Sequence, residues 1–254
     1  MTTQQPRAGA LGVIAGTGFY ALDALEGAQE VIVDTAFGAV RLTSGSMHGR
    51  PTYFVSRHGV DHSVPPHMVN YRAIMQALVD SGVSEILAIN VVGGIGHEAG
   101  ALVVVDDFID FTKQRPVTFF DGSSPEGVVH GDMGDPYDAR LRATWLSAAS
   151  ALGVDVTPTG VYGAFEGPRF ETKAEIRMVG AAGVTVVGMT GVPEVVLAAE
   201  RGIPYASLCL VANPAAGLSP EPITIEEVTA VVARGAQTVT AILDRAAAIL
   251  AEAE

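Results

Sequence analysis

Residues 13–22, VIAGTGFYAL, place a glycine turn directly after a strand-like apolar run, with the spacing G-x-G-x-x-A. Small residues in such a turn let backbone N–H groups approach an anion, and Thr17 adds a hydroxyl donor. The same spacing, followed by Asp34 at the end of the apolar run EVIVD, is typical of a dinucleotide site. The turn therefore predicts a nicotinamide cofactor, another bound anion, or a plain turn from strand to helix.

The chain after Asp34 argues against the dinucleotide interpretation. A dinucleotide fold needs a helix and a parallel crossover at this point. Residues 35–59 instead consist of short strand-like runs joined by glycine turns, which predicts an antiparallel meander. A turn that binds another anion and a plain turn from strand to helix therefore both stay open, and an NAD-dependent oxidoreductase is the remote alternative.

Two further strand-like runs end in residues that could bind a ligand. Arg57 and His58, in SRHG, follow one run, and a guanidinium beside an imidazole suits a phosphate. Gly93, Gly94 and Gly96, in INVVGGIG, follow another, where exposed backbone could line a pocket. Open α/β sheets place ligands at such strand ends. The alternatives are a solvated loop for the first pair and a plain turn for the glycines.

The segment GAFEGPRFET combines an aromatic ring with a carboxylate. Gly167 and Pro168 predict a turn, Phe170 offers a ring face, and Glu171 is expected in the first turn of a helix, where the dipole favours its charge. A ring face and a carboxylate together can hold a heteroaromatic ring. The alternatives are a core role for Phe170 and a purely helix-terminal role for Glu171.

Two later strand ends supply an apolar surface, a hydroxyl and an amide. Met189 and Thr190 precede a helix that begins with proline in GMTGVPEVVLAAE. Asn213, in LCLVANPAAG, ends the last apolar run, and its amide both donates and accepts. An asparagine before proline is also a common turn former.

Charge and cysteine content exclude several classes of protein. The chain has 28 acidic and 15 basic residues, a formal charge of −13, which argues against nucleic acid as a partner. Its one cysteine, Cys209, excludes a disulfide scaffold and is expected to be a buried thiol. The first residues lack the apolar region of a signal peptide, and no apolar run has membrane-spanning length, so we expect a cytoplasmic protein without a membrane partner.

Alternating strand-like and helical patterns predict one α/β domain over residues 1–254, with residues 1–9 disordered and a mixed, mostly parallel sheet flanked by helices. Strands are expected at Leu11–Ala15, Val31–Val33, Thr52–Val55, Glu85–Val92, Leu102–Phe108, Val184–Met189 and Tyr205–Ala212. Helices are expected at Tyr71–Ser81, Asp138–Leu152, Glu171–Gly180, Pro193–Glu200 and Ile225–Ala251, the last opened by a capping box of Thr224 and Glu227.

Taken in order, AGTGFY, SRHG, PPHMVNYRA, FDG, EGPRFET and GMTGVPEVVLAAE resemble the signatures of the methylthioadenosine phosphorylase and purine nucleoside phosphorylase family. The resemblance implies a purine/uridine phosphorylase-like fold and a homotrimer that splits purine (thio)nucleosides. Inorganic phosphate would be the co-substrate, with neither a metal nor an organic cofactor. The glycine turn would then bind phosphate.

Carried over residue by residue, the resemblance implies a role for each motif. Phe170 and Met189 would flank base and sugar, Glu171 and Asn213 would contact the purine edge, with Asn213 the donor near N7, and His130 would reach a neighbouring subunit's sugar site. The implied phosphate ligands are Thr17, Arg57, His58, Asn90, Val91 and Thr190.

Departures from the family pattern indicate the substrate. Adenine-specific members carry TDYD where this chain has ANPA, so Asn213 and Ala215 replace two acids, while Glu171 can accept the N1–H of a 6-oxopurine. Ile225 stands where 5′-hydroxyl-preferring relatives place a histidine, which favours a 5′-methylthio group, although it could simply start the apolar stripe of the last helix. We therefore expect S-methyl-5′-thioinosine, inosine or guanosine as substrate. A 5′-methylthioadenosine phosphorylase and a non-catalytic nucleoside-binding protein are alternatives.

Overall fold

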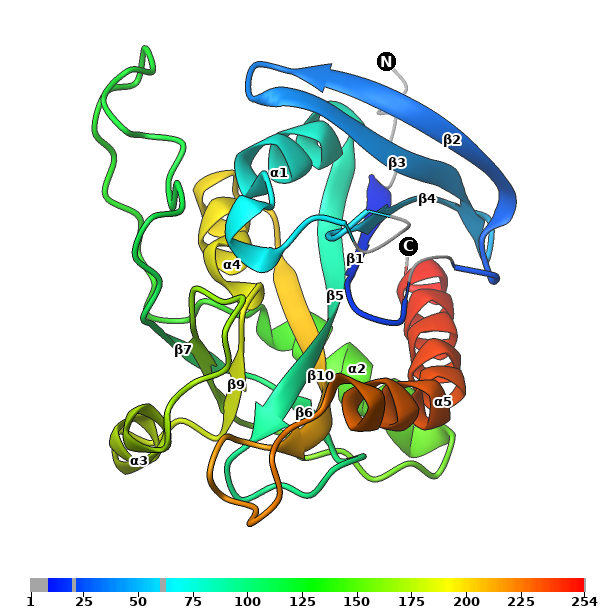
Figure 1. The fold of residues 1–254 in the computed structure, drawn as a ribbon. Helices are drawn as coiled ribbons and strands as arrows, with labels where there is room; N and C mark the ends of the chain where they lie inside the picture. Colours follow the sequence, from blue (N-terminus) through cyan, green and yellow to red (C-terminus); the bar gives the residue numbers. More distant parts are fainter. Residues whose placement is uncertain (1–8, 20–21, 60–62, 254) are drawn as a thin grey trace, which may run out of the picture.

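A single mixed sheet runs through the computed structural model, which describes residues 9–19, 22–59 and 63–253 (Figure 1). The disorder expected for residues 1–9 concerns a segment of which only Gly9 is described. The strands are β1 Ala10–Ala15, β2 Glu26–Thr35, β3 Gly38–Met47, β4 Arg50–Ser56, β5 Val83–Gly94, β6 Leu102–Val104, β7 Asp107–Asp110, β8 Val161–Ala164, β9 Val186–Gly188 and β10 Tyr205–Pro214. The helices are α1 Tyr71–Asp80, α2 Ala139–Ala151, α3 Lys173–Ala181, α4 Gly191–Glu200 and α5 Ile225–Glu252, with a short 3₁₀ turn at Pro66–Met68.

The centre of the sheet is parallel, and its first edge is the predicted meander. β4, β1, β5 and β10 pair in parallel, whereas β2, β3 and β4 pair antiparallel. Asp34 lies in β2, which β3 and β4 separate from β1. The dinucleotide interpretation is therefore wrong, because that fold sets the acidic strand beside the first strand.

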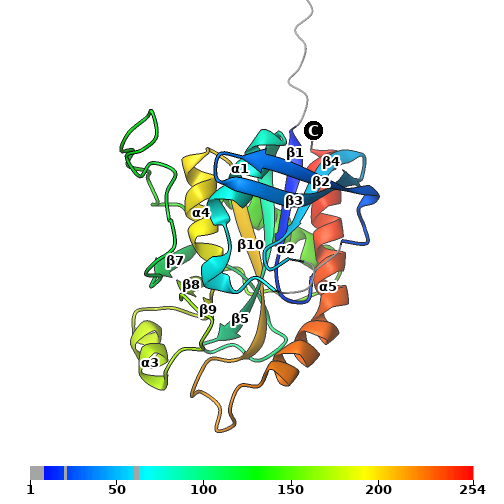
Figure 2. The ribbon, with the colours of Figure 1, turned by 45° about the horizontal axis from the view of Figure 1, so that its top comes forward.

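Both faces of the sheet are buried, as a covered parallel sheet requires. In β1, Leu11 and Val13 face the core shared with α2 and α5, whereas Ile14 faces the core shared with α1 and α4. Figures 1 and 2 show the two helix pairs on opposite sides of the central strands. Among the described helices, none is long and apolar enough to cross a membrane. Cys209 is buried as expected, and this burial raises the pKa of its thiol to about 12.

Three predicted elements are corrected by the structure. The strand expected over Leu102–Phe108 is two short strands, because β6 pairs with β10 whereas β7 pairs with β8. The apolar pattern of the sequence did not predict β8. Helix α3 begins at Lys173 with Thr172 as its N-cap, so Glu171 precedes the helix and is not in its first turn. For α5, the Thr224 side chain accepts from the N–H of Glu227 at 3.2 Å, which is one of the two bonds of the expected box.

Helix α5 packs directly against the glycine turn after β1. Gly18 has a φ of +81°, and a Cβ atom there would lie 2.2 Å from Cγ1 of Val232 on α5. Glycine is needed at this position for both reasons, since other residues avoid this backbone conformation and the helix leaves no space. The position of the turn is thus tied to that of α5.

We expect Gly18→Ala to lower the free energy of unfolding by about 2–4 kcal/mol, from about 1 kcal/mol of backbone strain and about 1–3 kcal/mol of overpacking. Gly27→Ala is the matched control, because Gly27 has a φ of +64° and a Cβ there meets nothing within 4 Å. Chemical denaturation of both variants and of Gly18→Ala/Val232→Ala measures the difference. Equal losses in the two single variants, or a double variant no better than the sum of its parts, would contradict the packing argument.

Candidate active site

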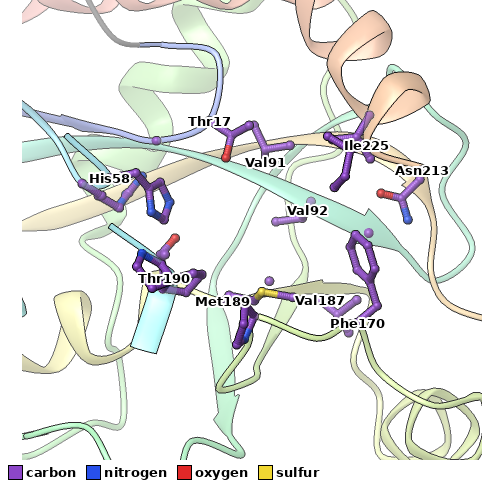
Figure 3. Close-up of a pocket in the computed structure, with 18 of the residues that line it drawn as sticks. Thr17, His58, Val91, Val92, Phe170, Val187, Met189, Thr190, Asn213 and Ile225 are labelled. Carbon is purple, nitrogen blue, oxygen red and sulfur yellow. The ribbon is translucent and has the colours of Figure 1, made fainter. Parts of the chain in front are cut away.

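The ends of the parallel strands surround a cavity of about 640 Å³. Its walls come from the turn after β1, the end of β4, the last residues of β5, the turn before α3, the connection from β9 to α4, the end of β10 and the start of α5 (Figure 3). Figure 3 shows His58 and Thr190 at one end and Phe170 and Asn213 at the other, with Met189 between them. The cavity therefore joins a polar end to an end that presents an aromatic ring and an amide.

Arg57 lies at the polar end, where it is fully paired with a carboxylate. Its Nε and Nη2 donate to the two carboxylate oxygens of Glu194 at 2.5 and 2.8 Å, and its Nη1 donates to the Ile89 carbonyl at 2.6 Å. Glu194 also accepts from the Tyr205 hydroxyl at 3.0 Å. Burial alone would lower the pKa of Arg57, but the adjacent Glu194 carboxylate raises it above the usual range. The guanidinium is thus held as a fixed cation whose charge is balanced from behind the cavity wall.

His58 and Thr190 are oriented by the backbone and by neighbouring side chains. Nδ1 of His58 lies 2.8 Å from the Val64 carbonyl, which only accepts, so this nitrogen carries the proton and Nε2 lies on the side of Gly16. The Thr190 hydroxyl donates to Oδ1 of Asn90 at 3.1 Å, and its N–H donates to the Tyr162 hydroxyl at 3.2 Å. These contacts fix the orientation of the imidazole and of Thr190 before any ligand binds, with Nε2 of His58 as an acceptor.

The other end of the cavity carries a buried carboxylate. Burial raises the pKa of Glu171, as does the nearby negative Glu175, whereas its own backbone N–H and Arg169 work in the opposite direction. Arg169 is engaged elsewhere, since its two Nη atoms donate to the Glu175 carboxylate at 2.9 and 2.8 Å. The expectation that a helix dipole stabilises the Glu171 charge is therefore wrong, because the residue precedes the helix and is desolvated.

An apolar part of the wall comes from the first turn and a half of α5. Ile225, Val228 and Thr229 line the cavity, and their spacing of three and four residues puts them on one face of the helix. The Ile225 side chain belongs to the cavity wall, and Figure 3 shows it above Asn213. It is not part of the buried stripe of α5, which begins at Val231.

The structure brings most of the predicted site residues together. Those that line the cavity are Thr17, Arg57, His58, Val91, Gly93, Pro168, Phe170, Glu171, Met189, Thr190, Asn213, Ala215 and Ile225. Asn90 lies behind the wall and contacts Thr190. His130 is exposed in the segment between β7 and α2, outside the residues that line the cavity.

Three residues that position this site were missed in the sequence. Glu194 pairs with Arg57, Tyr162 accepts from the N–H groups of Thr190 and Gly191, and Arg115 contacts five residues behind the walls. Glu194 had a detectable signal, because an acid inside the apolar helical run VPEVVLAA must find a buried partner. Tyr162 and Arg115 carried no such signal.

We expect Glu171→Gln to raise the melting temperature at pH 7–8 and to leave it unchanged near pH 4. A carboxyl whose pKa is raised by folding costs stability once it ionises, and this cost grows as the pH rises from the ordinary carboxyl pKa through the raised one. Glutamine keeps the shape and removes the charge. Thermal unfolding across this pH range tests the prediction, with exposed Glu98→Gln as control. An increase in melting temperature that does not change with pH, or a decrease at neutral pH, would contradict the prediction.

Comparison with known proteins agrees with this geometry. A model of the phosphorylase superfamily matches residues 10–248. A probable 6-oxopurine nucleoside phosphorylase from Dictyoglomus turgidum is 45% identical over 231 residues, covering 90% of this chain and 87% of that protein. A probable S-methyl-5′-thioinosine phosphorylase from Methanopyrus kandleri is 48% identical over 221 residues, covering 86% and 84%.

A solved structure extends the likeness to the fold. Methylthioadenosine phosphorylase from Schistosoma mansoni in complex with adenine matches with a TM-score of 0.91 at 31% identity, covering 96% of this chain and 92% of that one. The family resemblance of the sequence motifs is thereby confirmed. The chain belongs to the phosphorylase superfamily, as a member of its purine nucleoside phosphorylase family.

Proposed function

We propose that the protein cleaves purine nucleosides with inorganic phosphate, releasing the free base and ribose 1-phosphate or its 5-methylthio derivative. The observation that carries this proposal is one cavity with His58 and Thr190 at one end, Thr17 and Met189 between, and Phe170 and Asn213 at the other. One end offers donors to an oxyanion, and the other offers a ring face and a hydrogen-bonding edge. A nucleoside between them would present C1′ to the anion.

The arrangement can stabilise both charges that develop when the glycosidic bond breaks. Positive charge grows on the ribose, and phosphate held next to it serves as nucleophile and counter-charge, so positioning and electrostatics supply the catalysis. Negative charge grows on the leaving purine, and a donor near N7 would relieve it. Asn213 is our candidate, because its Nδ2 donates one N–H to the Pro214 carbonyl at 2.8 Å and an amide nitrogen has a second.

Phosphate would bind to the hydroxyl of Thr17, to Arg57 and His58, to the backbone at Val91 and to Thr190. Asn90 would contribute through Thr190, which it contacts directly. Because Glu194 already balances Arg57, hydrogen bonds would supply much of the affinity for the anion. The Thr17 hydroxyl would donate, the Thr190 hydroxyl would donate after turning from Asn90, and Nε2 of His58 would accept from a protonated phosphate oxygen. We further propose that the reaction uses no metal and no organic cofactor, as the family resemblance implies.

The base end suits a 6-oxopurine. The Glu171 carboxylate lines the cavity and can accept the N1–H that a 6-oxopurine has and adenine lacks. Ala215 lines the same end and brings no acid for an exocyclic amino group. The D. turgidum relative is named for 6-oxopurine nucleosides and the M. kandleri relative for S-methyl-5′-thioinosine, which supports this assignment. A 5′-methylthioadenosine phosphorylase remains the second candidate, because the S. mansoni protein shares the fold.

The apolar wall from α5 favours a 5′-methylthio group. Ile225 and Val228 would contact its sulfur and methyl carbon, and they offer no partner to a 5′-hydroxyl. The neighbouring Thr229 is the one polar side chain that α5 brings to this wall among the residues described as lining the cavity. We therefore propose S-methyl-5′-thioinosine as the preferred substrate and inosine or guanosine as weaker ones.

A homotrimer is part of the proposal. The segment between β7 and α2 stands away from the body of the subunit in both views (Figures 1 and 2), and its Val128 is 69% exposed. His130 lies in the same segment, so it would act in a neighbouring subunit's sugar site. A cytoplasmic location stays a prediction.

One assay tests the reaction and the sugar preference together. Purified protein is given equal concentrations of inosine and S-methyl-5′-thioinosine, with and without inorganic phosphate, and the bases and sugar phosphates are quantified. We expect base release only with phosphate, one sugar 1-phosphate per base, and a kcat/KM about 10–200-fold higher for the methylthio substrate, the range that one apolar group contributes in a pocket.

Each of the other outcomes would indicate a different function. Release without phosphate would indicate a hydrolase, and nucleoside binding without turnover would indicate a binding protein. An inosine kcat/KM equal to or above that of methylthioinosine would make the protein an ordinary purine nucleoside phosphorylase.

The base preference is tested by Asn213→Asp. An acid at this position can accept from the amino group of adenine and repels the 6-oxo group, so we expect the inosine-to-adenosine ratio of kcat/KM to fall by about 10–100-fold, the range for hydrogen bonds to charged groups. The KM for phosphate should stay unchanged. Gln237→Glu, an exposed amide-to-acid change on α5, is the control. A wild-type enzyme that cleaves both bases equally, or an unchanged ratio in the variant, would refute the assignment.

A further inference from the structure

We propose that Arg115 is a positioning residue that fixes the width of the base-and-sugar end of the cavity by joining its two walls from behind. The inference rests on the proposed function, because it predicts an effect on nucleoside binding. Arg115 itself is not among the residues that line the cavity. Its side chain is only 1% exposed, and it lies in the segment that follows β7.

One side of the guanidinium holds the connection from β9 to α4. Nη1 of Arg115 donates to the Met189 carbonyl at 2.7 Å and to the Val192 carbonyl at 2.9 Å. It also lies 3.3 Å from the Tyr71 hydroxyl of α1. Val192 has non-helical backbone angles within α4, so the chain is irregular where Arg115 holds it. Met189, whose side chain lines the cavity, is therefore anchored through its own carbonyl group.

The other side of the guanidinium holds the turn that carries Phe170 and Glu171. Nη2 of Arg115 donates to the Glu166 carbonyl at 2.7 Å and to the Phe165 carbonyl at 3.2 Å, directly before that turn. Nε is 3.4 Å from Oε1 of Glu166, a loose ion pair. The Glu166 carboxylate in turn accepts from the backbone N–H of Lys113. The short segment that carries Arg115 is thus fastened to the same turn.

The chemistry of the contacts requires arginine. Four backbone carbonyls and one hydroxyl surround a single planar group, which offers five N–H donors in two diverging pairs and one lone position. An ammonium group has three donors on one atom and cannot span both walls. Burial of this cation beside one loosely paired carboxylate lowers the stability of the fold. The presence of Arg115 is therefore better explained by a role in positioning the two walls than by a role in stability.

The phosphate end has separate anchors. Arg57 is held by Glu194 and the Ile89 carbonyl, and Thr190 is held by Tyr162 and Asn90. None of these contacts involves Arg115. The Met189 carbonyl that Arg115 binds shares a peptide group with the N–H of Thr190, but Tyr162 and Asn90 hold Thr190 independently. Loss of the Arg115 contacts should therefore loosen the walls around base and sugar more than it shifts the phosphate ligands.

The test is a split between two Michaelis constants. In Arg115→Met we expect the KM for the preferred nucleoside to rise and its kcat/KM to fall by about 10–100-fold, the scale of a misplacement of about 1 Å. The KM for phosphate should remain close to the wild-type value. Arg115→Lys should lie between wild type and Arg115→Met, because it keeps the charge and loses the fork.

A matched control is available at the far end of α4. Arg201 is a partly buried arginine, 4.0 Å above the Phe119 ring and bonded to Gln76 at 2.7 Å, and none of its described contacts is with either wall. Arg201→Met should leave both constants unchanged. Equilibrium binding of hypoxanthine and of phosphate, measured separately, gives the same comparison for any variant too slow to assay.

The outcomes separate this inference from the proposed function. An active wild type whose Arg115 variants raise both constants equally, or lose only thermal stability, would overturn the positioning role. A loss of phosphate binding in Arg115→Lys or Arg115→Met as large as the loss of nucleoside binding would do the same. A wild type without phosphorolysis would instead refute the proposed function.

Discussion

The buried pair of Arg57 and Glu194 is the interaction on which the site depends. It joins the end of β4 to α4, and through the Ile89 carbonyl and the Tyr205 hydroxyl it also reaches β5 and β10. Removal of one partner from such a pair typically costs about 3–5 kcal/mol, whereas apolar residues of equal volume would serve stability as well. The pair is therefore best explained by what it presents to the cavity. It supplies a rigid, charged guanidinium whose charge is balanced by the Glu194 carboxylate. An anion in the cavity would therefore meet fixed donors and little excess positive charge.

Close backbone approach makes the rest of the site possible. A Cβ on Gly188 would lie 2.2 Å from the Tyr162 hydroxyl, which reaches beneath the chain to accept from the N–H groups of Thr190 and Gly191. Gly18 likewise allows α5 to press against the turn after β1. Helix α5 thus contacts the glycine turn at Val232 and lines the cavity with Ile225, so one element positions both the glycine turn and the apolar part of the wall.

The sequence predicted what local pattern encodes. Apolar runs located the central strands, glycine turns located the meander, and the polar residues at the strand ends met in one cavity because parallel strands end at one edge. It could not predict contacts between distant segments. Arg57 and Glu194 are 137 residues apart, and Arg115 meets carbonyls 50 to 77 residues away. The expectation of one strand over residues 102–108 failed for the same reason. The two strands found there, β6 and β7, are distinguished only by their partners, β10 and β8.

The buried Glu171 carboxylate lowers the stability of the fold, and it lines the cavity where it can contact a ligand. Arg169, one of the two cations that lie two residues from Glu171 in the sequence, pairs with Glu175 and helps to lower the pKa of that carboxyl to about 2, first through its hydrogen bonds. Glu171 is left desolvated beside the ring of Phe170, in the same wall of the cavity. A desolvated carboxylate binds most favourably to a ligand that donates a hydrogen bond to it. A base that presents a lone pair at the same point leaves the carboxylate without a hydrogen-bond donor. Under the proposed function, selectivity for an N–H donor would come from the desolvated, weakly compensated charge of Glu171, and the stability that this charge costs would be regained when a matching base binds.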